Sequence, residues 1–137
     1  MAVSFDRPYA KYPQVVDLPL TQGSGEFLCW EFPLAFWLEQ HDYDVTYCSN
    51  IDTHADLAGL KRAKMFLSVG HDEYWSAGMR DTVEGFIGRG GNAAFLSGNT
   101  AFWQVRLEDP TPEGPAATMV GYKGQLKKDP VYGTDRV

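Results

Sequence analysis

Cysteines and long apolar runs are scarce in this sequence, and their scarcity excludes whole classes of protein. Cys29 and Cys48 are the two cysteines among 137 residues, too few for a disulfide framework, so we expect both to be ordinary core residues. No apolar run approaches the ~18 residues of a membrane-spanning helix, and no basic-then-apolar signal segment opens the chain. The sequence therefore predicts a soluble protein of the cytoplasm with no membrane partner.

Positive charge is also in short supply. Lys and Arg number 12 against 18 Asp and Glu, which gives a formal net charge of −6. Nucleic-acid binding depends on clustered basic side chains, and the adjacent basic pairs are Lys61 with Arg62 and Lys127 with Lys128. We therefore expect no nucleic-acid partner, and a small molecule or another protein in its place.

Apolar residues, by contrast, are plentiful enough for a folded domain. Hydrophobic residues make up 44% of the chain and aromatic residues 14%, a composition that excludes a disordered protein. A chain of this length can bury a core as one domain without a metal or disulfide. We expect residues 1–107 to form an α/β domain and residues 108–137 to be an extended, Pro- and Gly-rich tail of the same domain.

The stretch from Met65 to Trp75 is the centre of the predicted fold. Residues 65–69 are apolar apart from Ser68, which favours a short strand buried on both faces. Gly70 ends this run, and a helical pattern follows from Ser76 to Arg89. Ligands of open α/β sheets bind at the carboxyl ends of strands, so the polar residues 71–73 stand where a binding site is expected.

Similar units flank this centre. Residues 26–40 have a helical pattern that starts near Glu31 with Pro33 in its first turn, and residues 44–49 and 93–96 are strand-like. A further strand fragment covers residues 3–5. Three successive strand–loop–helix units predict a parallel sheet with helices on both faces, the flavodoxin-like arrangement.

Three polar residues are candidates for chemistry. His71 and Glu73 lie two positions apart, which is not the spacing of a helical zinc site. Asn99 follows the next predicted strand, so its amide can point into the same crevice. The alternative is structural: Asp72 and Glu73 complement the N-terminus of the following helix, His71 is a hydrogen-bonded loop residue, and Asn99 is a turn residue.

Aromatic residues surround these candidates in the sequence. We expect Tyr74, Trp75 and Trp103 to form walls of a pocket, because large rings bury area well and need few polar partners. Cys48 lacks the sharp Gly-x-Cys-x-Gly turn that presents a nucleophile, which argues against a thiol mechanism.

Four stretches carry a resemblance to a known family: SFDRPY (residues 4–9), WLEQHDYDV (37–45), VGHDEYW (69–75) and SGNTAFW (97–103). They resemble the C-terminal part of the large (beta) subunit of N,N-dimethylformamidase and its relatives, over residues 3–105. The resemblance implies a class I glutamine-amidotransferase-like α/β domain without the usual cysteine nucleophile. Relative to that domain, we expect this chain to be an incomplete copy whose N-terminal part is missing.

The resemblance also implies a mononuclear Fe(III) centre held by two tyrosines and one glutamate. Glu73 matches the glutamate ligand, Tyr9 is the candidate for one tyrosine, and the other tyrosine is expected upstream. His71 and Asn99 match positions that assist catalysis. Phenolate and carboxylate oxygens are hard ligands suited to Fe(III), which acts as a Lewis acid on an amide carbonyl.

Two functions therefore remain open from the sequence. The first is an iron-dependent amidohydrolase that cleaves the C–N bond of a small amide, with a small subunit or a second copy of the chain as partner. The second is a non-catalytic amidotransferase-like module for binding or assembly. Stoichiometric iron in the purified protein would distinguish the first from the second.

Overall fold

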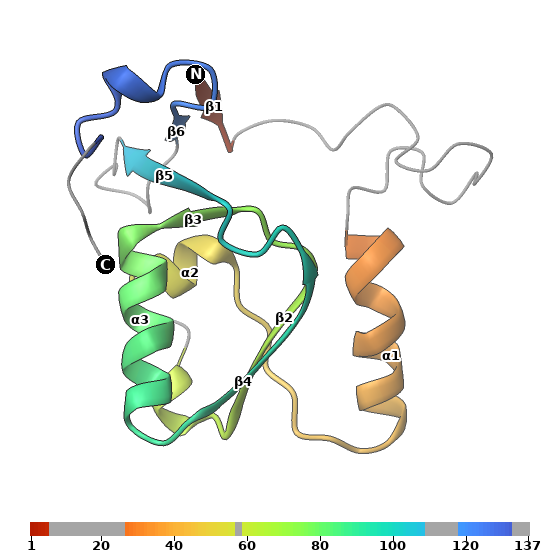
Figure 1. Ribbon diagram of the computed structural model, residues 1–137. Helices are drawn as coiled ribbons and strands as arrows, with labels where there is room; N and C mark the ends of the chain where they lie inside the picture. Colours follow the sequence, from red (N-terminus) through yellow and green to blue (C-terminus); the bar gives the residue numbers. More distant parts are fainter. Residues whose placement is uncertain (6–26, 57–58, 109–117, 133–137) are drawn as a thin grey trace.

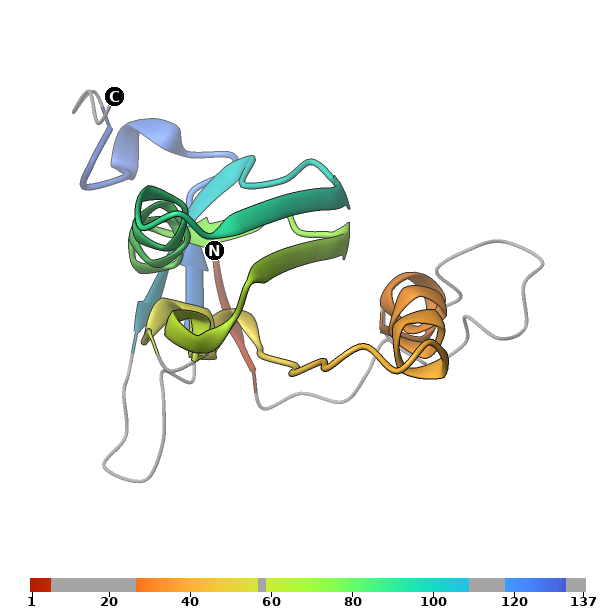
Figure 2. The same cartoon turned by 90° about the horizontal axis from the view of Figure 1, so that it is seen from below.

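The computed structural model describes residues 1–5, 27–56, 59–108 and 118–132 (Figures 1 and 2). The elements, in chain order, are β1 (Ala2–Ser4), η2 (Phe27–Glu31), α1 (Phe32–Gln40), α2 (Asn50–His54), η3 (Leu60–Arg62), β2 (Met65–His71), β3 (Tyr74–Ser76), α3 (Ala77–Gly88), β4 (Asn92–Gly98), β5 (Trp103–Glu108), β6 (Thr118–Gly121) and η4 (Leu126–Lys128).

These strands form two sheets. One has two parallel strands, β2 and β4, and the other has four strands in the order β1-β6-β5-β3. In the four-stranded sheet β3 and β5 are parallel, whereas β5 with β6 and β6 with β1 are antiparallel. The predicted single parallel sheet with helices on both faces, of flavodoxin or amidotransferase type, is therefore wrong.

Two local differences explain this error. Residues 44–49 form no strand, because no strand of the described residues pairs with them, and the side chains of Tyr47 and Cys48 in this stretch are exposed. The apolar residues after Thr100 lead into β5, not into a third helix, and the chain then returns antiparallel as β6. Burial of β2 also differs from the prediction: Phe66 and Ser68 are buried, but Met65 is exposed.

Two short connections join the two sheets: residues 72–73 between β2 and β3, and residues 99–102 between β4 and β5. We call these two connections together the break. The segments β2–β3 and β4–β5 run parallel to each other, and Figure 1 shows both bending between the sheets. Met65 pairs with Asn92 before the break and Tyr74 with Trp103 after it, so the second segment takes up two more residues than the first. Backbone N–H groups still bridge the break, from Ala101 to the carbonyl of Asp72 at 2.9 Å and from Trp103 to that of Glu73 at 2.9 Å.

Helix α3 supplies most of the core. The Ser76 hydroxyl accepts a hydrogen bond from the Met79 N–H at 3.2 Å, which caps the helix where the sequence predicts its start. Its buried side chains, at helical spacing, pack against the two parallel segments and η3. The core cluster consists of Leu60, Phe66, Trp75, Met79, Val83 and Phe86.

Helix α1 contributes nothing to this core. It has no buried residue, and aromatic side chains such as Phe36 and Trp37 are exposed on it. Figures 1 and 2 show it standing beside β2 and β4, apart from the rest of the fold. The helix itself is predicted correctly, with Pro33 in its first turn. Within the described ranges, no helix has the length and apolar character to cross a bilayer.

Candidate functional site

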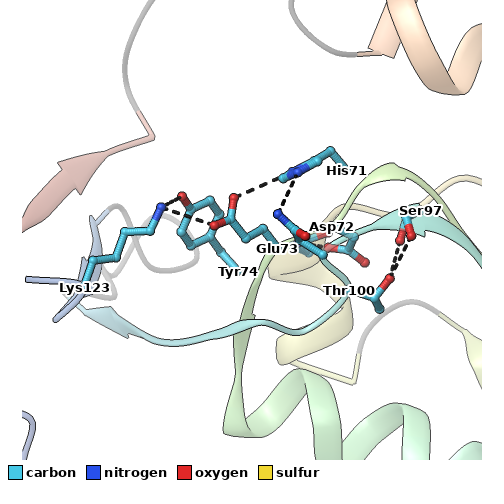
Figure 3. A network of polar contacts seen from close by, with 9 residues as sticks. His71, Asp72, Glu73, Tyr74, Ser97, Thr100 and Lys123 are labelled. Carbon is cyan, nitrogen blue, oxygen red and sulfur yellow. Dashed lines mark hydrogen bonds and ion pairs between the residues drawn. The ribbon is translucent and has the colours of Figure 1, made fainter. Parts of the chain in front are cut away.

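Glu73 stands at the centre of a polar cluster at the break between the sheets. Its Oε1 lies 3.2 Å from the ammonium nitrogen of Lys123, and its Oε2 lies 3.7 Å from Nδ1 of His71. Figure 3 shows the three side chains in a row, with Glu73 in the middle. Glu73 lies between β2 and β3, whereas Lys123 follows β6, so the site needs the antiparallel return of the chain.

Electrostatics hold Glu73 in its ionised form. Burial by itself would raise the pKa of Glu73, but the hydrogen bond and charge of Lys123 lower it below the ordinary 4.5, with further contributions from Tyr74 and His71. The hydrogen bond to Tyr74 raises the pKa of Lys123, as does Glu73, against the opposing effect of desolvation. At neutral pH the site therefore contains a carboxylate and an ammonium group in contact.

The ammonium group of Lys123 contacts two aromatic rings. Its ammonium group donates a hydrogen bond to the hydroxyl of Tyr74 and lies 4.7 Å from that ring's centroid. The centroid of the Trp103 ring is 5.6 Å away, and Tyr74 and Trp103 are opposite each other in the β3–β5 pairing. A cation over ring faces is attracted by their quadrupoles, so this contact stabilises the charge of Lys123.

Two of the three predicted wall residues therefore lie at the site. Tyr74 and Trp103 also line a hollow next to Lys123, together with Val3, Val105, Met119 and Tyr122. Trp75 is different, because successive side chains of a strand point to opposite faces. It is 6% exposed and packs in the core with α3, away from Lys123.

His71 and Asn99 also meet at the break. Nδ2 of Asn99 lies 3.4 Å from Nε2 of His71, the ring nitrogen opposite the one that faces Glu73. Gly98 supports this arrangement, since a Cβ atom there would lie 3.2 Å from Cδ2 of His71. The structure thus brings together three of the residues singled out from sequence: Glu73, His71 and Asn99.

Comparison with known proteins decides the family. The whole chain, residues 1–137, matches the family model described as N,N-dimethylformamidase beta subunit-like, C-terminal. The chain belongs to this family. It is 32% identical over 98 residues to the N,N-dimethylformamidase beta subunit of Alcaligenes sp.

The family resemblance read from the sequence is thus confirmed. The wider relation to the glutamine amidotransferases is not shown, and the two sheets lack the parallel arrangement that it implied. The match to the Alcaligenes protein covers 66% of this chain and 12% of that relative, so the chain spans a small part of the relative's length. No solved structure matches the chain.

The ligand set expected for a dimethylformamidase-type iron site can be compared with the side chains at the break. Glu73 fits one position, because its carboxylate is held ionised and carboxylate oxygens suit Fe(III); its side chain is 15% exposed. Tyr9, the other expected ligand, lies outside the described residues. Within the described ranges, no three His, Cys, Asp or Glu side chains gather where they could hold a metal ion. The described part of this dimethylformamidase-like chain therefore offers one fitting ligand.

Lys123 is the residue that sequence reasoning missed. It lies between Tyr122 and Gly124 in the segment expected to be a tail, where no motif marks it. Its position depends on the pairing of β6 with β5, which places residue 121 opposite Val105. A signal was present only in Thr118, Met119 and Val120, whose β-branched and apolar side chains are compatible with a strand.

Proposed function

We propose that this chain carries part of the active site of an amide-hydrolysing enzyme that cleaves the C–N bond of a small amide of the N,N-dimethylformamide type. The observation that carries the proposal is the Glu73 carboxylate, held ionised by Lys123 and flanked by His71 and Asn99 in a member of this family. Family membership supports the reaction class, and the geometry supports the roles that we propose for the side chains.

Iron is part of the same proposal. Glu73 would hold Fe(III) through its carboxylate, with Tyr9 and a further tyrosine of the intact protein as the remaining ligands. Fe(III), when bound there, supplies Lewis acidity toward an amide carbonyl and a bound water. The ionised state of Glu73 supports this role, since a metal ligand must be deprotonated.

Two side chains of the chain itself would transfer the proton and stabilise the developing negative charge. His71 turns Nδ1 toward Glu73, so its Nε2 carries the lone pair, which the Asn99 amide approaches to 3.4 Å. With the attacking water in place of this long contact, Nε2 would take a proton from the water and return it to the departing amine nitrogen. The Asn99 amide is a hydrogen-bond donor on the same side, where it can stabilise the negative charge that develops on the carbonyl oxygen. The products are a carboxylic acid and an amine.

A partner subunit also belongs to the proposal. The Alcaligenes relative is named as a beta subunit, and α1 of this chain has an aromatic surface that the described residues leave uncovered. We therefore place the chain in an assembly with another subunit.

A non-catalytic role is the second candidate, and one contact favours it. Lys123 already neutralises Glu73, so the pair can act as a structural link between β6 and the break. In that case the protein would bind no iron, and replacing Glu73 would lower stability alone.

Iron content separates the two candidates. The intact protein is expressed in iron-replete medium, and iron per chain and hydrolysis of N,N-dimethylformamide are measured for it and for Glu73→Gln. Glu84→Gln is the matched control, because Glu84 is an exposed helix carboxylate paired with Arg80 at 2.6 Å. We expect one iron in the unmodified protein and the control, and none in Glu73→Gln. An iron-free unmodified protein, or full iron occupancy in Glu73→Gln, would contradict the proposal.

A further inference from the structure

Asp72 has a set of contacts that the proposed reaction does not use. Its carboxylate accepts a hydrogen bond from the Ser68 hydroxyl at 2.8 Å and another from the Asn50 side-chain amide at 3.1 Å. Its backbone carbonyl accepts the Ala101 N–H at 2.9 Å. A residue between His71 and Glu73 thus connects β2, α2 and the turn after β4.

The hydroxyl groups near Asp72 form a chain with one direction. The Ser68 and Ser97 hydroxyl oxygens lie 3.1 Å apart, and those of Ser97 and Thr100 lie 2.6 Å apart. Ser68 gives its single proton to Asp72, so it accepts from Ser97, and Ser97 then accepts from Thr100. The Thr100 hydroxyl also lies 3.3 Å from the backbone carbonyl oxygen of Ser97, a second and more distant acceptor. Hydrogen bonds to an ionised acceptor are the strong ones, so the carboxylate of Asp72 orients the whole chain.

The row of hydroxyl groups ends at Thr100, in a turn whose backbone is strained. Asn99 has φ 50° and Ala101 has φ 53°, the left-handed region that residues other than glycine rarely adopt. Asp72 reaches this turn twice, through the hydroxyl chain to Thr100 and through its carbonyl to Ala101. Figure 3 shows Ser97 next to Thr100, and Asp72 between this pair and Glu73.

We propose that Asp72 is a positioning residue that holds the Asn99 turn so that the Asn99 amide meets His71. The contact between Nδ2 of Asn99 and Nε2 of His71 is 3.4 Å, near the upper limit of a hydrogen bond, so a small displacement of the turn breaks it. Ser68 is 4% exposed, so solvent has little access to its hydrogen bond with Asp72. The inference rests on the proposed function for its catalytic consequence, but the positioning itself is independent of iron.

The test uses the intact protein with Asp72→Asn, Thr100→Val and Thr100→Ser. Valine has the shape of threonine without the hydroxyl, whereas serine keeps the hydroxyl. We expect kcat to fall about tenfold in Asp72→Asn and Thr100→Val with KM unchanged, because small misplacements of catalytic groups are costly. Thr100→Ser should retain the unmodified kcat. Asp129→Asn is the stability control, because Asp129 also accepts two donors, from Arg106 and the Val131 N–H, outside the site.

Crystal structures of the same variants provide a readout that does not depend on activity. In Asp72→Asn and Thr100→Val the Asn99 amide should move out of hydrogen-bond reach of His71, and in Thr100→Ser it should stay. If the intact protein hydrolyses no amide, the proposed function fails and these structures alone decide the positioning. An unchanged Asn99–His71 contact in Thr100→Val would overturn the inference, and so would equal losses in Thr100→Val and Thr100→Ser. If Asp72→Asn does not fold, the comparison of the two Thr100 variants decides between these outcomes.

Discussion

The ammonium group of Lys123 lies 3.2 Å from the carboxylate of Glu73, although one follows the last strand of the described chain and the other precedes β3. This ion pair ties the four-stranded sheet to the break that leads to β2 and β4. It also sets the charge of the candidate ligand, because Lys123 lowers the pKa of Glu73.

Replacement of Lys123 by methionine tests this coupling. The pKa of Glu73 should rise in Lys123→Met, because burial then acts without a compensating cation. Because the pKa of Glu73 is lower in the folded state than the ordinary 4.5, its ionisation stabilises the fold at pH values above 4.5. That stabilisation is lost as the pH falls through the lower pKa of the folded state. Unfolding by denaturant, measured from pH 7 downward, should show this acid-dependent loss in the intact protein and a smaller one in Lys123→Met.

The control for this substitution is Lys61→Met, which removes an exposed lysine that pairs with Asp56 at 3.4 Å. Its pH dependence should match that of the unmodified protein. The pKa of Glu73 can be measured by carbon-13 NMR in the unmodified protein and in Lys123→Met. Equal values would show that the ion pair does not lower the pKa of Glu73.

Gly91 should be intolerant of any side chain. A Cβ atom there would overlap the ring of Phe86, which is buried in the core beneath α3. Gly91→Ala is expected to lower the free energy of unfolding by about 1 to 3 kcal/mol, as overpacking does. Gly88→Ala is the matched control, because no described atom lies within 4 Å of the added methyl group at the end of α3. Denaturant titration of both variants should show a loss in the first alone.

Gly98 should also be intolerant of a side chain, here because of its contact with a candidate catalytic residue. A methyl group at this position would lie 3.2 Å from the His71 ring, so the ring must shift by a few tenths of an ångström. Gly98→Ala should therefore lower the rate of amide hydrolysis while iron content stays the same. Gly124→Ala, next to Lys123 but with no atom of the described residues within 4 Å, should leave the rate unchanged. Equal rates in the two variants would show that the position of the His71 ring does not matter.

His71→Ala and Asn99→Ala should separate catalysis from metal binding. Both side chains are assigned to proton transfer and oxyanion support, so each loss should lower kcat about a hundredfold with iron retained. Iron content and rate are measured on the same preparation. Loss of iron in either variant would make that residue a metal ligand.

Local signals explain which parts of the fold the sequence could predict. The apolar run of β2 and the capping serine of α3 are local signals, each carried by a few consecutive residues, and both elements form where expected. Residues 44–49 have the composition of a strand but find no partner strand in the described ranges, and the pairing of β5 with β6 joins residues separated by an intervening segment. Pairings of this kind depend on tertiary contacts that composition does not encode.

The candidate site divides along the same line. His71, Glu73 and Asn99 lie together because they stand at or just after the ends of two neighbouring parallel strands, and their roles stay predictions. Neither Lys123 nor the Asp72 network could be predicted from the sequence. Lys123 reaches the site only through the return of the chain in β6, and the Asp72 network depends on side chains of α2, β2 and the turn after β4 that meet in the fold.

The difference in length between the two connections at the break limits which insertions and deletions homologues can carry in the turn of residues 99–102. Two extra residues in the 99–102 turn preserve the alternation of β5, whose Val105 is 2% exposed and whose neighbour Gln104 points outward. A one-residue insertion or deletion would reverse every side chain of β5, because the side-chain period of a strand is two. Val105 would then face solvent, and Trp103 would leave Lys123. Homologous genes that keep the site should accordingly differ here by even numbers of codons.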